Sequence, residues 1–254
     1  MFDQDLIRLS QSHLNLLSRC PPKFQQVYID CLGSLPAPEQ QDSMQWGSRF
    51  HLLMQQRELT LPIEPLLAMD SELDHSLKAL IQAAPELAPD PDIWREAEHC
   101  RTLSVDNFLF TVIYDLLIAE ADRATILDWK TYRQPIEAKK LKQNWQTRLY
   151  LYVLVETTAY QPEQVQMTYW FVKSGQPKSV AIAYSKAEHQ RTKQEIAALL
   201  ADLTTWLTNY REHQLNFPHQ PNCETVCHYC TEFATIDSQP EILKSIDEIE
   251  EISI

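Results

Sequence analysis

Several features of membrane, secreted and energy-coupled proteins are missing from this 254-residue chain. It has no apolar run of about 18 residues, the length at which a membrane-spanning helix is suspected. Its first residues lack the basic and then apolar sequence of a secretory signal. It also has no motif for nucleotide hydrolysis, no internal repeat and no low-complexity tract. We therefore expect a soluble cytoplasmic protein with no membrane partner.

Positive charge is also scarce. The chain has 22 Lys and Arg against 35 Asp and Glu, which gives a net charge of −13 at pH 7. This balance disfavours a protein that coats nucleic acid nonspecifically, because phosphate binding needs a locally positive surface. Basic residues nevertheless gather between Lys130 and Arg148. They form either a solvated helix face or a strip that contacts phosphate.

Six cysteines are present, and in a cytoplasmic chain they indicate metal binding or ordinary burial rather than a disulfide framework. Cys223, Cys227 and Cys230 lie close together, whereas Cys20 stands alone near the start. Cys31 and Cys100 are expected to be small buried residues.

The periodicity of apolar residues predicts a mixed α/β (α+β) fold. Helical patterns come first, three antiparallel strands follow between Cys100 and Lys130, and a long helix follows over 136–158. A hairpin over 164–184 and a last helix over 186–213 complete the order. We assign residues 1–235 to one domain, with a helical insertion at 58–97 and a cysteine segment at 217–235. An acidic tail occupies 236–254.

The chemistry is concentrated in two of these strands. Thr111 to Asp115 and Thr125 to Lys130 read as a hairpin that places two carboxylates and one ammonium at neighbouring strand ends. Asp115 and Asp128 supply the oxygen ligands that Mg²⁺ or Mn²⁺ prefers. Lys130 lies two residues after Asp128, so both side chains point to one face, about 6.5 Å apart along the strand. Alone, such a pair more often marks an exposed strand edge, but here the acids follow apolar segments.

With these residues the chain resembles the PD-(D/E)XK nuclease superfamily, specifically the branch with the RecB, AddB and Cas4 nuclease domains. The resemblance covers most of the chain and rests on five motifs in order before the C-terminal cysteines. They are Leu9-Ser-Gln-Ser12 through Cys20-Pro-Pro-Lys23-Phe24, Gly47-Ser-Arg-Phe-His51, Ile113-Tyr-Asp115, Leu127-Asp128-Trp-Lys130-Thr131 and Gln146-Thr-Arg-Leu-Tyr150.

The resemblance implies a restriction-endonuclease-like fold, with a central mixed sheet flanked by helices. It implies that His51, Asp115, Asp128 and the Trp129 carbonyl bind Mg²⁺ or Mn²⁺, and that Lys130 is the catalytic lysine. Gln146 and Tyr150, four residues apart on one helical face, would orient the site or touch substrate phosphate. Without the resemblance, His51 would more often be an ordinary interior or surface histidine.

The resemblance also implies a use for the cysteines. Thiolates of Cys20, Cys223, Cys227 and Cys230 could hold a structural [4Fe–4S] cluster, as in several nucleases of that branch. A four-cysteine zinc site and no metal at all are the alternatives, and His219 and His228 could replace thiolates around zinc.

The motif set as a whole predicts a metal-dependent DNA nuclease that acts on single strands or ends in repair or recombination. DNA is its expected substrate, and a helicase or other repair proteins are its expected partners. The alternative is a catalytically weak DNA-binding or scaffold module of a larger repair complex, which the acidic balance favours slightly.

Overall fold

A mixed six-stranded sheet forms the centre of the computed structural model, which describes residues 6–33, 38–132, 135–173 and 176–220. Its strands are β1 (Ile7–Leu9), β2 (Trp94–Val105), β3 (Phe108–Ala119), β4 (Ala124–Lys130), β5 (Val165–Phe171) and β6 (Lys178–Ala183). The order is β1-β3-β4-β5-β6, and β2 pairs with β3 outside this path. The β1–β3 and β4–β5 pairs are parallel and the other pairs are antiparallel. The predicted mixed sheet is thus confirmed.

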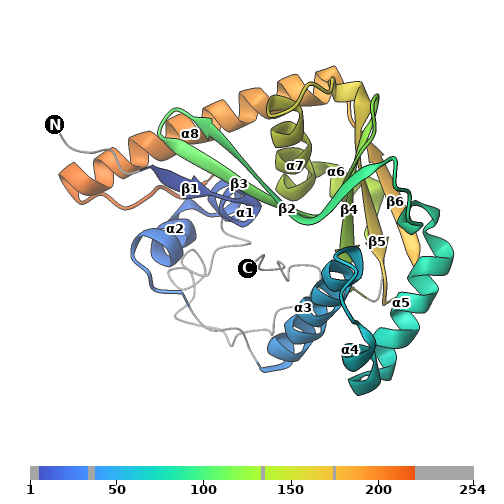
Figure 1. Ribbon diagram of the computed structural model, residues 1–254. Helices are drawn as coiled ribbons and strands as arrows, with labels where there is room; N and C mark the ends of the chain where they lie inside the picture. The colour runs from blue at the N-terminus through green and yellow to red at the C-terminus, as the bar shows by residue number, and fades with distance from the viewer. Residues whose placement is uncertain (1–5, 34–37, 133–134, 174–175, 221–254) are drawn as a thin grey trace.

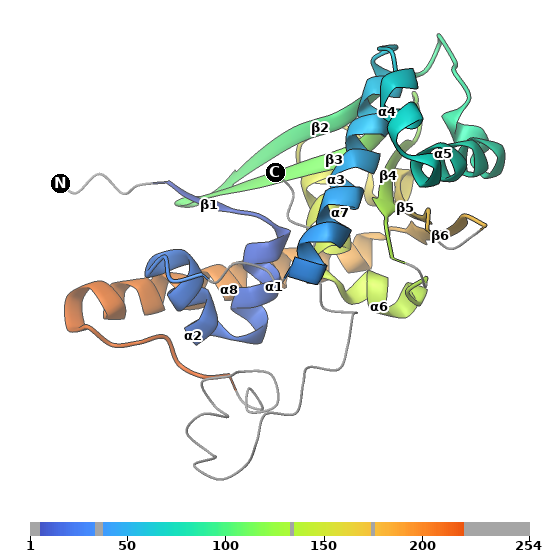
Figure 2. The ribbon, with the colours of Figure 1, turned by 90° about the horizontal axis from the view of Figure 1, so that it is seen from below.

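Helices cover both faces of this sheet (Figures 1 and 2). Side chains of α1 (Gln11–Arg19), α7 (Trp145–Glu156) and α8 (Lys186–His213) pack in one apolar cluster with the sheet. Side chains of α3 (Pro38–Glu58) and α5 (Ser71–Ala83) pack in a second cluster. The shorter helices are α2 (Pro21–Phe24), η1 (Gln25–Ile29), α4 (Glu64–Met69), η2 (Pro85–Leu87), α6 (Ala138–Gln143) and η3 (Pro162–Gln164). Within the described ranges, no helix combines the length and the apolar character needed to cross a membrane.

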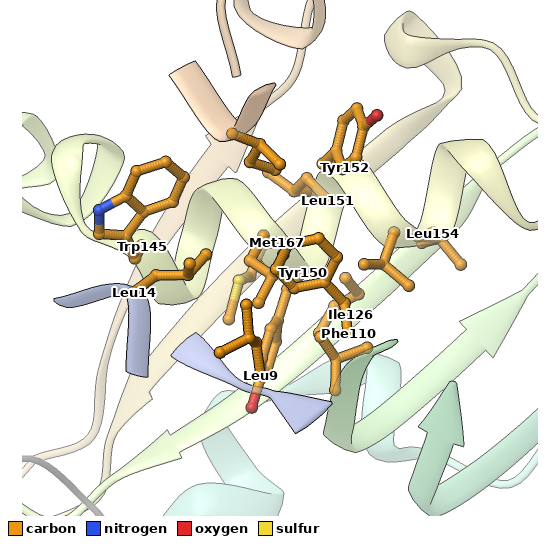
Figure 3. Packing of buried hydrophobic residues seen from close by; sticks show 14 of the residues in the cluster. Leu9, Leu14, Phe110, Ile126, Trp145, Tyr150, Leu151, Tyr152, Leu154 and Met167 are labelled. Carbon is orange, nitrogen blue, oxygen red and sulfur yellow. The ribbon is translucent and has the colours of Figure 1, made fainter. Parts of the chain in front are cut away.

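Strand β4 is buried along its whole length because helices cover both of its faces. Its side chains alternate: Ile126 joins the cluster around α7, whereas Leu127 and Trp129 join the cluster around α3 and α5. Figure 3 shows Ile126 with Met167 of β5 under the side chains of α7. By the same alternation, Asp128 and Lys130 fall on the α7 side of the sheet. Two charged groups therefore interrupt an otherwise apolar layer.

Three boundaries differ from the sequence prediction. The long helix expected over 136–158 is two helices, α6 and α7, because Asn144 adopts an extended backbone and its side chain accepts from the Gln146 amide at 2.8 Å. Such a cap starts a new helix, a signal that the continuous apolar pattern conceals. Strand β2 begins at Trp94 rather than at Cys100. Strand β3 continues to Ala119, so Asp115 lies inside a strand and not at its end.

Candidate active site

Strand β3 exchanges one neighbour for another close to Asp115. β2 pairs along one edge of β3, while the other edge pairs with β1 at 108–110 and with β4 only from Leu116 onward. The Trp129 amide donates to Asp115 Oδ2 at 2.7 Å, so this side chain takes the place of a further backbone partner. The side of the sheet to which alternate β3 side chains point also changes here. Tyr114 packs in the cluster with α7, whereas Leu116, two residues later, packs in the cluster with α3. Backbone pairing along this edge of β3 is therefore interrupted beside the Asp115 carboxylate.

Helix α3 brings His51 to that opening. His51 Nδ1 lies 3.4 Å from Asp115 Oδ1 and 3.9 Å from Glu98 Oε1. Its Nε2 lies 3.1 Å from the Trp129 carbonyl oxygen, to which a protonated Nε2 donates. Gly47 of α3 faces the end of β4, where an added Cβ would stand at contact distance, 3.4 Å from Thr131 Oγ1. A side chain longer than that of alanine would therefore press on Thr131 at this position.

Glu98 of β2 is the functional candidate that the sequence did not reveal. His51, Glu98 and Asp115 each offer a ligand atom, and these atoms lie within 4.8 Å of one another. Glu98 stands opposite Asp115 in the β2–β3 register, in a break of the pairing, with φ of 51°. That left-handed backbone is unfavourable for a non-glycine residue and is typical of functional positions. Sequence reasoning missed it because the strands were expected to begin at Cys100, two residues after Glu98, whereas β2 begins at Trp94.

The electrostatics of this trio fit a bound cation. Burial, and then the negative charge of Asp115, raise the pKa of Glu98 to about 7, while His51 acts in the opposite direction. Two carboxylates and an imidazole are ligands that Mn²⁺ and Mg²⁺ accept, and a divalent ion would offset the repulsion between the acids. The residues present therefore suit a divalent metal.

Asp128 and Lys130 form a second charge group next to the first. Their residues are 1% and 4% exposed, and Lys130 Nζ lies 3.0 Å from Asp128 Oδ2. Gln146 Nε2 donates to Asp128 Oδ1 at 2.7 Å. Of the four predicted ligand positions, His51, Asp115 and the Trp129 carbonyl thus meet directly, whereas Asp128 is oriented toward Lys130 and Gln146. Both aspartates act electrostatically on the Tyr150 phenol, so this side chain lies near both groups.

Gln146 and Tyr150 support the site from α7. Tyr150 is buried, and burial followed by the charges of Asp128 and Asp115 raises its pKa, so the phenol stays protonated. Its backbone carbonyl accepts from the Tyr114 hydroxyl at 3.1 Å. The phenol is too enclosed to reach a substrate. Gln146 is the α7 residue that contacts a carboxylate, since it donates to Asp128.

Of the cysteines, Cys20 is buried at the junction of α1 and α2, whereas Cys31 and Cys100 are exposed. The expectation that Cys31 and Cys100 are buried was therefore wrong, because Cys31 follows the last turn of η1 and Cys100 faces outward on β2. Cys223, Cys227 and Cys230 lie outside the described residues, as does most of the predicted cysteine segment.

Comparison with known proteins bears on the family and the fold of the chain. Residues 8–232 match the PD-(D/E)XK nuclease superfamily. The fold is similar to the crystal structure named "Putative exonuclease" from Eubacterium rectale, with a TM-score of 0.53 and 10% identity over 94% of each chain. The crystal structure of SSO0001 has a TM-score of 0.39 and 14% identity, over 90% of this chain and 88% of that chain. No curated protein matches the sequence.

Proposed function

The chain belongs to the PD-(D/E)XK nuclease superfamily, and from that premise we propose that it is a divalent-metal-dependent nuclease of DNA. The observation that carries the proposal is the meeting of two charge groups from four elements. His51 of α3, Glu98 of β2 and Asp115 of β3 form one, and Asp128 and Lys130 of β4 form the other. A carboxylate and imidazole cluster beside a buried lysine is an arrangement suited to phosphodiester hydrolysis.

Each residue has a distinct task in this proposal. His51, Glu98, Asp115 and the Trp129 carbonyl would hold Mg²⁺ or Mn²⁺, with Asp128 next to them. The ion, when bound, supplies Lewis-acid polarisation of the phosphate and a water of lowered pKa. Lys130, held by Asp128, presents a positive charge where the attacking oxygen and the phosphate meet. Gln146 keeps the Asp128 carboxylate in the orientation that holds Lys130.

The test is degradation of end-labelled DNA with Mg²⁺ or Mn²⁺ by the wild type and by Lys130→Ala. Lys139→Ala is the matched control, because Lys139 is an exposed lysine nearby on α6. We expect loss of cleavage in Lys130→Ala only, with circular dichroism showing that both variants fold. Equal activity of Lys130→Ala and the wild type would remove the proposed mechanism.

The finer part of the proposal concerns the mode of cleavage and the cellular process in which the nuclease acts. The order of motifs resembles the RecB-like branch, and the Eubacterium rectale protein carries the word exonuclease in its name. Both support action on single strands or ends, in repair or recombination, together with a helicase or other repair proteins. Linear and circular single-stranded DNA distinguish the modes, since an exonuclease leaves the circle intact. The scaffold alternative predicts that neither the linear nor the circular DNA is cleaved. It also predicts that calorimetry detects no Mn²⁺ binding at this site, so that Asp128→Ala and the wild type behave alike.

The cysteine cofactor also remains a proposal. The superfamily match extends past Cys223, Cys227 and Cys230, and Cys20 is a buried thiol at a helix junction. A [4Fe–4S] cluster or a zinc ion would then join the two ends of the domain. Anaerobic purification with an absorption spectrum and metal analysis separates the two metals. Cys20→Ala should lose whichever metal is present.

A further inference from the structure

Exposed apolar side chains are concentrated in one part of the molecule. Among the described residues, nine large apolar side chains are exposed, and six of them lie between Leu52 and Trp94. The densest group flanks α4: Leu59 and Leu61 precede the helix, and Met69, which is 82% exposed, ends it. Figures 1 and 2 place α4 on the outer side of α3, away from α8. Single exposed leucines are ordinary on a protein surface, whereas a group of them indicates a binding site.

Helix α4 presents an apolar face to solvent. Leu66 and Leu67 pack against the apolar cluster of α3 and α5, yet none of the six residues of this helix is fully buried. Pro65 and Met69 are four residues apart, so they lie on one helical face, and both are exposed. A surface helix ordinarily carries charged or polar residues on that face. We use the name α4 surface for Leu59, Leu61, Pro65 and Met69.

Charged groups hold both ends of the α4 surface in place. At the end of α3, Glu58 Oε1 lies 2.6 Å from Arg57 Nη1, and Glu58 Oε2 lies 2.7 Å from Arg95 Nε of β2. These three side chains are each at most 18% exposed. Directly after α4, Asp70 caps α5 with its side chain and lies 3.1 Å from Arg49 of α3. A surface that is fixed in this way loses little conformational entropy when a partner binds.

The charge around the α4 surface restricts the chemistry of its partner. The helical insertion, residues 58–97, contains nine Asp and Glu against Lys78 and Arg95, so it carries −7 of the net charge of −13. Three cations from outside the insertion pair with its acids, and the acids still exceed the cations by nine to five. These cations are Arg49, Arg57 and Lys173. The surroundings of the α4 surface are therefore acidic.

Glu64 places a negative charge directly beside the α4 surface. It is exposed at the first position of α4, one residue before Pro65, and it forms no ion pair in the part of the chain that the structure describes. A second copy of the chain would bring the same acids to this surface and would be repelled, as would nucleic acid and anionic lipid. A segment with apolar and cationic side chains complements both the apolar face and the acids.

We propose that the α4 surface docks a cationic and apolar segment of a partner protein. Apolar side chains of that segment cover Leu61 and Met69, and its lysines or arginines lie next to Glu64. The partner is thereby joined to α3, the helix that carries His51, without contacting any of the proposed metal ligands. Docking can therefore be tested separately from the nuclease function.

The experiment uses a labelled helical peptide of about 18 residues, built from leucine and lysine so that it has one apolar and one cationic face. Fluorescence anisotropy measures its affinity for the full chain. We expect binding that Met69→Ser and Leu61→Ser each weaken about tenfold, as for apolar anchors at the centre of an interface. Leu215→Ser is the matched control and should bind as the wild type does. Leu215 is 57% exposed and Leu61 50%, but Leu215 lies after α8.

A charge reversal tests the acidic part of the surface. Glu64→Lys should weaken binding of the peptide at low ionic strength and much less at about 1 M salt, where the Debye length is only about 3 Å. Glu212→Lys makes the same change in net charge at an exposed position of α8, and it should have little effect. A second peptide, in which glutamate replaces lysine, should not bind.

Three results would overturn the docking proposal. One is equal affinity of the peptide for the wild type, Met69→Ser and Leu61→Ser, with native circular dichroism of all three. Another is a dimer in sedimentation that Met69→Ser dissociates, which would assign the surface to a second copy of the chain. The third is binding to phosphatidylglycerol vesicles that Met69→Ser abolishes, which would assign it to a membrane. Both variants should cleave DNA as the wild type does, and absence of cleavage by all three would reject the nuclease function alone.

Discussion

Replacement of Lys130 by methionine should destabilise the protein as well as inactivate it. Met keeps the length of the side chain but removes the ammonium that lies 3.0 Å from Asp128 Oδ2. Because Asp128 is 1% exposed, water cannot replace that cation. Removal of one partner from a buried pair costs about 3–5 kcal/mol. For a protein of this size, that corresponds to a melting temperature lower by about 6–20 °C.

The companion variant, Asp128→Asn with Lys130→Met, removes both charges and keeps the volume of the site. Its amide can still accept from Gln146, so we expect most of the lost stability to return while cleavage stays absent. Urea denaturation of the metal-free proteins, followed by circular dichroism, gives the free energies. A double variant as unstable as Lys130→Met would show that packing, and not the uncompensated charge, caused the loss. Unchanged stability of Lys130→Met would refute the reasoning altogether.

Three further predictions concern Glu98, Gln146 and Gly47. Since the pKa of Glu98 is raised to about 7 from 4.5, the metal-free protein should lose stability as the pH rises through this window, and Glu98→Gln should melt higher than the wild type at pH 8. The same proton competes with metal, so Mn²⁺ affinity measured by calorimetry should rise toward pH 7 in the wild type and vary less in Glu98→Gln. Gln146→Ala should lower kcat about 10- to 100-fold with little change in KM, because it releases Asp128 and not the substrate; an unchanged kcat would exclude the orienting role. Gly47→Ala should keep activity and gain up to about 1 kcal/mol in helix stability. Gly47→Leu should press on Thr131 and lower activity. Equal behaviour of the two variants in melting and cleavage assays would contradict this account.

Alternation along β4 explains why part of the site was predictable. Ile126 and Leu127 pack on opposite faces, so the common face of Asp128 and Lys130 follows from a period of two, and the structure shows the two groups in contact. The bounds of α8 also follow from local signals, since Ser185 caps its start. These features depend on neighbours in sequence.

Glu98 was not predictable for the opposite reason. Its position depends on a break in the β2–β3 ladder and on a left-handed backbone, and neither leaves a mark in the pattern Trp94-Arg-Glu-Ala-Glu98. Asp115 was expected at a strand end because it follows the apolar segment that begins at Thr111. Here β3 continues past it with a new neighbour, so the exposure of the carboxylate comes from the sheet topology.

The distribution of charge explains how an acidic chain can act on a polyanion. The acids of the site, Glu98 and Asp115, gather where a divalent cation would neutralise them, and Asp128 is already neutralised by Lys130. Loading of the metal should therefore remove the negative charge that repels a phosphate at the site. Affinity for a single strand should rise on addition of Ca²⁺, which occupies carboxylate sites, and this gain should vanish in Asp115→Asn. Equal affinity of the wild type with and without Ca²⁺ would contradict this account.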